Sequence, residues 1–135
     1  MSGRTGGYLC GKVRYQAEGT PIWVAHCHCK SYRKASVAPI VTWAGYHRVT
    51  VTWVAKPFAY SSYVLRCFCP DCDRPVSYES TRWPDELQIP VATLDDPEGV
   101  TPTAHVYWSE HLAWLEIGNT LKKLATTGTA PKKEH

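Results

Sequence analysis

Six cysteines fall in three short groups along the chain, and their spacing limits its fold more than any other feature. The groups are Cys10, then Cys27 and Cys29, and then Cys67, Cys69 and Cys72. Close spacing of this kind is typical of metal ligands rather than of a disulfide framework. With 135 residues the chain can bury a hydrophobic core without disulfide bonds. The sequence therefore predicts a small domain in which thiols bind zinc.

Composition and charge limit the location and the classes of partner that we expect for this chain. Residues 1–6 lack the apolar run of a signal peptide, and no stretch reaches the ~18 apolar residues that span a bilayer. We therefore expect a cytoplasmic protein with reduced thiols and no membrane partner. The formal net charge of +3 is too small and dispersed to indicate nucleic acid. The chain contains six Trp and eight Tyr but only two Phe. Trp and Tyr side chains often surround ligand clefts.

Short runs rich in β-branched and aromatic residues follow one another, separated by turn residues. This pattern predicts a mainly β single domain. The expected strands are residues 12–17, 22–27, 39–43, 49–54, 60–68, 75–78, 87–91, 105–108 and 112–117. One short helix is expected around residues 30–36. We expect a leader at residues 1–6, the β domain at 7–120 and a flexible tail at 121–135.

The strongest local motif is the Cys69-x-x-Cys72 pair. Two thiolates at this spacing can close on one metal ion, whereas a redox pair would be followed by a helix, and a strand-like run follows here. Cys10 is the candidate third ligand of this zinc. Cys67 is either the fourth ligand or a small buried apolar residue.

The second group alternates His26, Cys27, His28 and Cys29, so an extended backbone would point both thiols to one side. Two thiolates leave positions open for water or an incoming thiol, as catalytic zinc requires. We expect His26 and His28 to be hydrogen-bonding residues outside the metal shell. The basic cluster that follows is either a solvated helix face or an anion site.

Several further motifs occur in a fixed order from Gly6 to about Leu121. They are Gly6-Gly7-x-Leu9-Cys10-Gly11-x-Val13-Arg14-Tyr15, His26-Cys27-His28-Cys29-x-x-x-Arg33-Lys34-Ala35-Ser36, Arg66-x-Phe68-Cys69-x-x-Cys72, Thr93-Leu94-Asp95-Asp96-Pro97 and Trp114-Leu115-x-Ile117. Together they resemble the glutathione-dependent formaldehyde-activating enzyme family, which includes centromere protein V. The resemblance implies a zinc-binding β fold related to the β-tent of methionine sulfoxide reductase B domains.

The resemblance also implies an activity. Such an enzyme is a carbon–sulfur lyase acting in reverse, which joins glutathione to formaldehyde as S-hydroxymethylglutathione. Zinc would be the cofactor and glutathione the thiol co-substrate. Cys27 and Cys29 would be catalytic, because zinc there would hold the thiol as thiolate. Lys30, Arg33 and Lys34 would bind the glutathione carboxylates.

Four positions depart from the family pattern. Tyr8 replaces a ligand of the structural zinc, and Tyr32 replaces the third ligand of the open zinc. Asp73 and Val37 stand where glycine is usual, and Val adopts a left-handed backbone with difficulty. We expect the structural position to hold zinc more readily than the open one. The alternative functions are a catalytically impaired zinc-binding or interaction module and a thiol redox protein.

Overall fold

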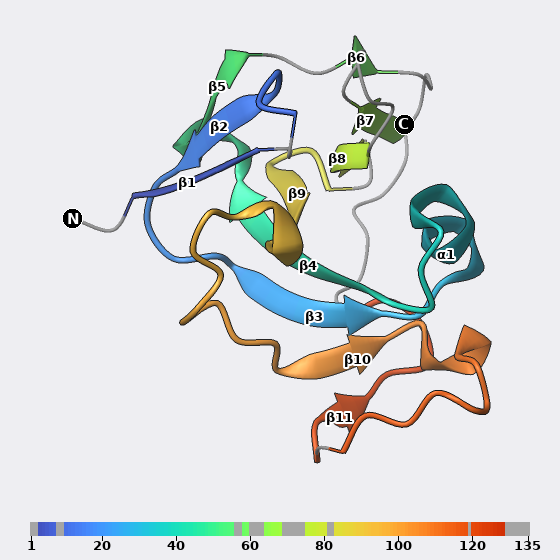
Figure 1. Cartoon of the computed structure of the whole chain (residues 1–135). Coiled ribbons are helices and arrows are strands. Elements are labelled where there is room, and N and C mark those ends of the chain that lie inside the picture. Colours follow the sequence, from blue (N-terminus) through green and yellow to red (C-terminus); the bar gives the residue numbers. More distant parts are fainter. Residues whose placement is uncertain are drawn as a thin grey trace.

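The computed structural model describes residues 3–7, 10–55, 58–59, 64–68, 75–80, 83–118 and 120–128. These residues form two β-sheets, three short 3₁₀ turns and one α-helix. The prediction of a mainly β fold is thereby confirmed (Figure 1). Among the described residues no helix is long and apolar enough to cross a membrane.

The smaller sheet is antiparallel and contains three strands. They are β1 (Arg4–Gly7), β2 (Arg14–Ala17) and β5 (Val51–Ala55), in the order β1-β2-β5. Tyr15 and Ala17 are buried while Gln16 between them is exposed, as expected for a half-buried strand. Residues 4–6, which the sequence analysis placed in a leader, pair with β2 from Ala17 to Tyr15.

The larger sheet carries the remaining strands in the order β11-β10-β3-β4-β9-β8-β7-β6. Their bounds are β3 (Trp23–Cys27), β4 (Val41–His47), β6 (Phe58–Ala59), β7 (Val64–Phe68), β8 (Pro75–Ser80), β9 (Glu86–Pro90), β10 (Ala104–Val106) and β11 (Lys122–Lys123). Strand β10 is parallel to both β3 and β11, and the other pairs are antiparallel.

The main core lies between the two sheets. Its buried members come from both of them: Tyr15, Ala17, Val24, Ala44, Tyr46, Leu87, Ile89, Val91, Leu94 and Val100. A second buried cluster contains Cys27, Cys29 and Trp43. Side chains alternate along a strand, so Val24 and Ala44 turn toward the main core while Cys27 and Trp43 turn to the other face.

The motif at residues 93–97 joins the small sheet to the rest of the domain. Asp95 accepts hydrogen bonds from Arg14 of β2 and from the hydroxyl of Thr5 in β1, the latter at 2.6 Å. The Asp95 N–H donates to the Thr5 carbonyl at 2.9 Å. The Arg14 guanidinium beside Asp95 lowers the pKa of that carboxyl. The aspartate in this motif therefore has a structural role.

The helix prediction is confirmed, since α1 runs from Lys30 to Ser36. Val37 follows it in the left-handed region, with φ 52° and ψ 49°, and the Ala38 N–H donates to the Arg33 carbonyl at 3.1 Å. This arrangement is a helix C-terminal motif that favours glycine. Val37 thus adopts a left-handed conformation that a β-branched residue enters with difficulty.

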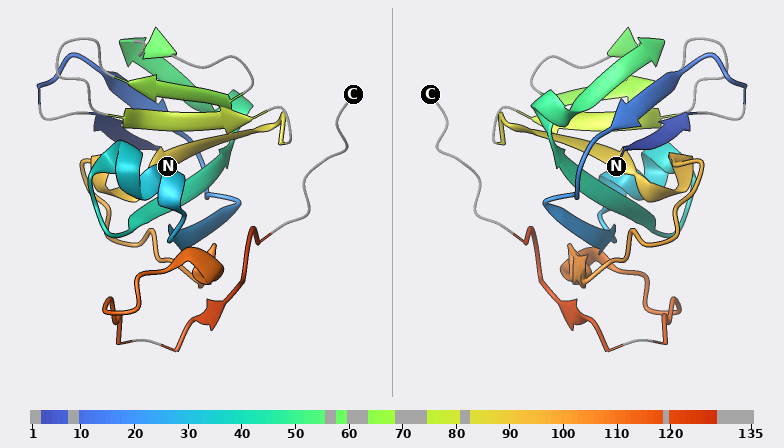
Figure 2. Two further views of the ribbon diagram at one scale, coloured as in Figure 1. Left: turned by 90° about the vertical axis from the view of Figure 1, so that its right-hand side faces the viewer. Right: turned by 90° about the vertical axis from the view of Figure 1, so that its left-hand side faces the viewer.

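Several predicted strands are wrong or shortened. Residues 112–117 form no strand: the Leu115 N–H bonds back to the Leu112 carbonyl, and Trp114 is 70% exposed. The expected strand at 105–108 ends at Val106, because Tyr107 has φ 54° and a 3₁₀ turn, η3 (Trp108–Glu110), follows. The free edge of β10 is occupied instead by β11, from the segment predicted as a tail. In Figure 2 η3 and β11 lie at the opposite end of the molecule from β5.

Candidate functional site

Cys27 and Cys29 lie where β3 ends and helix α1 begins. Cys27 is the last residue of β3, and Cys29 caps the N-terminus of α1 with φ −67° and ψ 145°. The Cys29 sulfur accepts the Tyr32 N–H at 3.4 Å, in the way that capping side chains satisfy an unpaired helix N–H. Both thiols are buried. The chain reversal between strand and helix thus brings the two cysteines together.

The two thiols are also hydrogen-bonded to each other. The Cys27 thiol donates to Cys29, and this bond, reinforced by burial, raises the pKa of Cys27. The same bond lowers the pKa of Cys29 to about 7. Burial acts in the opposite direction, while hydrogen bonds from the Tyr32 and Ser31 N–H groups lower this pKa further. Cys29 is therefore the more readily ionised of the two thiols.

A cavity of about 230 Å³ opens beside Cys27. Five of the described lining residues are aromatic. The lining consists of Trp23, Val24, Ala25, Cys27, Tyr32, Trp43, Trp83, Glu86, Gln88, Thr103, Ala104, Val106, Tyr107, Lys122, Leu124, Thr127 and Gly128. The rings of Tyr32 and Trp43 pack with centroids 4.6 Å apart. The cavity lies on the face of the large sheet opposite the main core.

One wall of the cavity depends on Gly45 in β4. The Trp23 indole lies so close to Gly45 that a Cβ there would come within 2.4 Å of the ring. Trp23 Nε1 then donates to Glu86 Oε1 at 3.0 Å. The absence of a side chain at position 45 therefore lets the indole lie against β4, and Glu86 fixes its orientation.

The segment at residues 122–128 forms another wall. It is attached by backbone hydrogen bonds to the end of β10 and to η3. The Leu124 N–H donates to the His105 carbonyl at 2.8 Å, the Trp108 N–H donates to the Leu124 carbonyl at 2.9 Å, and the Tyr107 N–H donates to the Thr126 carbonyl at 2.9 Å. Part of the segment predicted as a tail, residues 122–128, therefore contributes to the lining of the cavity.

The histidines lie on the other side of β3. His28 and His105 are fully buried, with His28 Nε2 and His105 Nδ1 2.9 Å apart. His26 Nδ1 lies 2.8 Å from the Thr42 hydroxyl. Burial, with a smaller contribution from His105, lowers the pKa of His28 to about 4. Both His26 and His28 are thus hydrogen-bonded, as expected.

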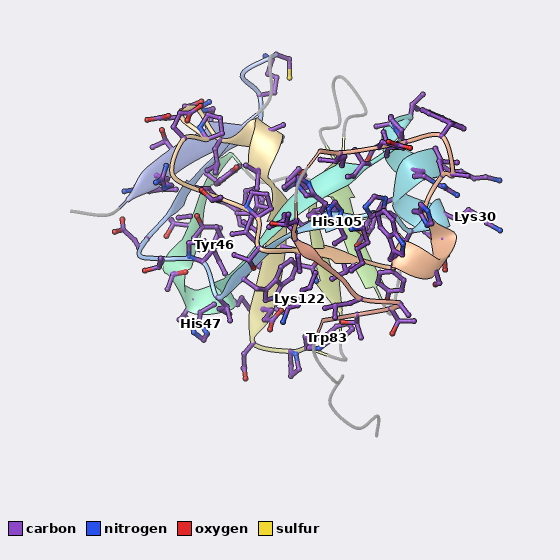
Figure 3. All side chains as sticks on the ribbon, turned by 90° about the horizontal axis from the view of Figure 1, so that it is seen from below. Lys30, Tyr46, His47, Trp83, His105 and Lys122 are labelled. Carbon is purple, nitrogen blue, oxygen red and sulfur yellow. The ribbon has the colours of Figure 1, made fainter. Side chains whose placement is uncertain are left out.

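The basic residues of α1 are not among the residues that line the cavity. The Lys30 N–H donates to Glu110 Oε1 at 2.7 Å, and Arg33 Nη1 donates to the Glu110 carbonyl at 2.9 Å. These bonds tie α1 to η3. Lys30, Arg33 and Lys34 do not line the cavity, and Figure 3 shows Lys30 well away from Trp83 and Lys122. Their binding of glutathione carboxylates stays a prediction.

The donor groups do not form a complete open zinc site. Within the described ranges no three His, Cys, Asp or Glu side chains are grouped to hold a metal ion. Cys27 and Cys29 supply two thiols, and the third position is Tyr32, whose ring packs on Trp43. These residues do not fit the three-thiolate pattern of a catalytic zinc.

The structural zinc stays a prediction. Tyr8, Cys69 and Cys72 lie outside the described residues. Cys67 belongs to β7, whose side chains are likewise not described. Cys10, the remaining candidate ligand, is exposed.

Sequence reasoning missed most of the cavity. It singled out Cys27 and Tyr32 but not Trp23, Trp43 or Lys122. The excess of Trp and Tyr was a signal of a ligand cleft, but composition does not indicate which rings meet.

Comparisons with known proteins identify the family and support the fold. A family model described as "Glutathione-dependent formaldehyde-activating enzyme" matches residues 3–110. No curated protein matches the chain. Among solved structures, the chain is similar to the crystal structure of a Rhodobacter sphaeroides protein at 21% identity, with a TM-score of 0.56. That match covers 73% of this chain and 91% of the other, and at this identity it supports the fold alone.

Proposed function

Because this chain belongs to the glutathione-dependent formaldehyde-activating enzyme family, we propose that it joins a thiol to an aldehyde in the cavity beside Cys27. One observation carries the proposal: Cys27, a thiol of the family motif, forms part of the wall of the cavity. A reaction between two small organic molecules needs such a space, where both are held close and water is largely displaced. Glutathione and formaldehyde are the proposed pair.

The reaction balances without an oxidant or reductant. The sulfur of the bound thiol attacks the carbonyl carbon, so that an S–C bond forms and the C=O π bond breaks. The thiol proton ends on the new hydroxyl oxygen. The Cys27 thiol donates to Cys29, and Cys29 accepts the Tyr32 N–H. Cys29, whose pKa is lowered, would take the departing proton through the Cys27 thiol and return it by the same path to the oxygen as that atom gains charge, while the Tyr32 N–H holds the Cys29 sulfur in place.

Zinc is the group that the family pattern would supply at this site, where it would polarise the carbonyl or hold the thiolate. Because Tyr32 stands in the third ligand position, the described residues do not complete that site, and the proposed steps do not use the metal. The structural zinc at Cys10, Cys69 and Cys72, the β-tent architecture and a cytoplasmic location belong to the same proposal.

The test measures S-hydroxymethylglutathione formed from glutathione and formaldehyde, above the uncatalysed rate. We expect acceleration by the wild-type protein and a loss of at least about tenfold in Cys27→Ala. Thr52→Ala, at an exposed position on β5, is the control and should keep the wild-type rate. Both variants are first compared with the wild type by circular dichroism and thermal unfolding.

Tyr32 favours a second candidate, a catalytically impaired zinc-binding or interaction module. Its ring packs on Trp43 where the family pattern has a ligand. Under this alternative the wild-type protein gives no acceleration even with zinc supplied. That result would exclude an enzyme acting on this thiol and aldehyde.

A further inference from the structure

We propose that Cys27 and Cys29 form an oxidation site, which a small hydroperoxide entering the cavity closes to a reversible disulfide. This modification is separate from the proposed function, because it changes the two thiols themselves and needs no aldehyde. Three observations carry it. The thiols lie together in one buried cluster, the backbone around them is fixed by hydrogen bonds, and Tyr32 stands where a third metal ligand would be.

The two cysteines are close enough in the chain to form a disulfide without a large backbone movement. Residues two apart in an extended strand have Cα atoms about 6.4–6.8 Å from each other. That separation is within the roughly 4.4–6.8 Å found between the Cα atoms of disulfides. Cys27 and Cys29 belong to the buried cluster with Trp43, whereas His28 between them bonds to His105. The two sulfurs therefore lie on the same side of the chain.

Hydrogen bonds fix the backbone between and after the two thiols. The His28 N–H, which lies between them, donates to the Val106 carbonyl of β10 at 3.1 Å. The Cys29 carbonyl accepts the Arg33 N–H at 3.1 Å, in the first turn of α1. Figure 1 shows this helix beginning directly beyond the end of β3. Groups that the fold holds side by side react faster than free groups, because the entropy of bringing them together was already lost on folding.

Tyr32 leaves the pair without the ligand that would complete a zinc site. Its ring packs on Trp43 with centroids 4.6 Å apart, and its N–H donates to the Cys29 sulfur at 3.4 Å. In the part of the chain that the structure describes, no third His, Cys, Asp or Glu side chain joins the two thiols to hold a metal ion. The departure from the family pattern therefore favours two sulfurs that react with each other.

The cavity gives a small oxidant a path to one sulfur of the pair. Both cysteines are buried, with 3% of Cys27 and 8% of Cys29 exposed. Cys27 lines the cavity of about 230 Å³, whereas Cys29 is not among its lining residues. Hydrogen peroxide is little larger than a water molecule, which occupies about 30 Å³ of liquid, so it fits this space. Cys27 is therefore the sulfur that meets the oxidant, and Cys29 is the one that closes the disulfide.

The chemistry balances with the hydroperoxide as the only added reactant. The Cys27 sulfur attacks one peroxide oxygen and the O–O bond breaks. The thiol proton goes to the departing hydroxide, which leaves as water, and Cys27 becomes a sulfenic acid. The Cys29 sulfur then attacks the Cys27 sulfur, so that an S–S bond forms, the S–O bond breaks and a second water leaves. The two thiols lose two electrons and two protons, which the peroxide takes up, and a dithiol reductant reverses the change.

Trypsin provides a direct test, because cleavage after Arg14 and Lys30 releases residues 15–30 with Cys27 and Cys29 as their only cysteines. The protein is treated with hydrogen peroxide, the remaining thiols are alkylated with iodoacetamide, and the mass of the peptide is measured. The reduced peptide should carry two alkyl groups. The oxidised peptide should carry none and be about 2 Da lighter than the unalkylated dithiol, the mass of two hydrogens. Dithiothreitol should restore the doubly alkylated form.

Two variants test the order of the steps. Cys29→Ser removes the second thiol and keeps a side chain that can cap α1. It should accumulate sulfenic acid at Cys27, detected as at least about tenfold more dimedone adduct on residues 15–30 than in the wild type. Cys27→Ala removes the sulfur in the cavity and leaves a small apolar residue at a buried position. It should form at least about tenfold less of this adduct than Cys29→Ser does.

Cys10 is the control within the same digest. It is exposed, and the tryptic peptide of residues 5–12 contains no second cysteine. This peptide therefore cannot form an internal disulfide, and it should never show the loss of two hydrogens. Tyr32→Cys with zinc supplied is the matched variant, since it gives the pair a third thiolate. It should form the disulfide at least about tenfold more slowly than the wild type, because the sulfurs are then bound to the metal.

Three results for the wild type would overturn the inference. They are residues 15–30 with both thiols still alkylated after excess peroxide, added oxygen without the loss of two hydrogens, and a disulfide that forms only after a chelator removes a metal ion. Dimedone labelling of Cys29 in Cys27→Ala as strong as that of Cys27 in Cys29→Ser would overturn the order of the steps. These measurements involve neither glutathione nor formaldehyde, so failure of the proposed function leaves their outcome unchanged.

Discussion

Replacing Val37 with glycine should stabilise the protein, although it removes a hydrophobic side chain. Val37 follows helix α1 with φ 52° and ψ 49°, and its side chain is 91% exposed. The left-handed conformation costs an L-residue about 1–2 kcal/mol, with a β-branched residue such as valine at the upper end. Glycine avoids this cost, and almost no buried apolar area is lost.

The gain is reduced by the unfolded state. Glycine has more backbone freedom than valine when the chain is unfolded, which costs about 0.5–1 kcal/mol on folding. The difference predicts that Val37→Gly raises the free energy of unfolding by about 0.5–1 kcal/mol. For a domain of this size such a gain corresponds to a rise in Tm of about 2–5 °C.

Val49 provides the matched control. It is 90% exposed and lies in the 3₁₀ turn η1 (Arg48–Thr50), and it is absent from the described residues with positive φ. Val49→Gly therefore keeps the unfolded-state cost without relieving strain. It should lower the free energy of unfolding by about 0.5–1 kcal/mol.

Urea unfolding followed by circular dichroism measures both variants against the wild type, with the slope m checked for constancy. The reasoning is refuted if Val37→Gly lowers the free energy of unfolding as much as Val49→Gly does. Such a result would mean that the left-handed backbone at Val37 is not strained.

Three further predictions concern the ion pair, the buried imidazole and the third ligand position. Asp95→Asn should lower the free energy of unfolding at pH 7 by no more than about 1 kcal/mol, because its pair with Arg14 is partly exposed. Because the pKa of Asp95 is lowered in the folded state, the difference in free energy of unfolding between the wild type and Asp95→Asn should be present above pH ~4, the ordinary pKa range of an aspartate. It should disappear as the pH is lowered further, as measured by urea titrations. His28, with a pKa lowered to about 4 from 6.5, binds protons more readily in the unfolded state, so stability of the metal-free protein should fall from pH 6.5 toward pH 4. His28→Gln should flatten that dependence in thermal melts, and an unchanged slope would contradict the assignment. Tyr32→Cys should raise zinc content by about one ion per chain in metal analysis, since it supplies a third thiolate beside Cys29, and unchanged zinc content would show that this position is not the defect.

Local sequence patterns predicted much of the backbone. Residues 30–36 form the expected helix, because Cys29 can cap it and the chain turns after Ser36. The expected strands at 22–27 and 87–91 correspond to β3 and β9, since their apolar residues alternate between two faces. Residues 112–117 carry the same kind of alternation but form no strand, because a strand needs a partner and the edge of β10 is occupied by β11.

The sequence by itself determined the family and the thiols of the site. Cys27 and Cys29 are two residues apart, so the chain reversal from β3 to α1 is enough to bring them together. The motifs that indicated the family are local in the same sense, and the match over residues 3–110 confirms it.

Only the tertiary structure decided what the thiols face. Trp43 and Lys122 lie far apart in the chain and come to line one cavity through strand pairing, in particular the parallel pairing of β10 with β3 and β11. Such contacts depend on which strands become neighbours, and that choice is made by burial of the whole core rather than by any local pattern. For the same reason, the segment that resembled a flexible tail in the sequence is a wall of the site in the folded protein.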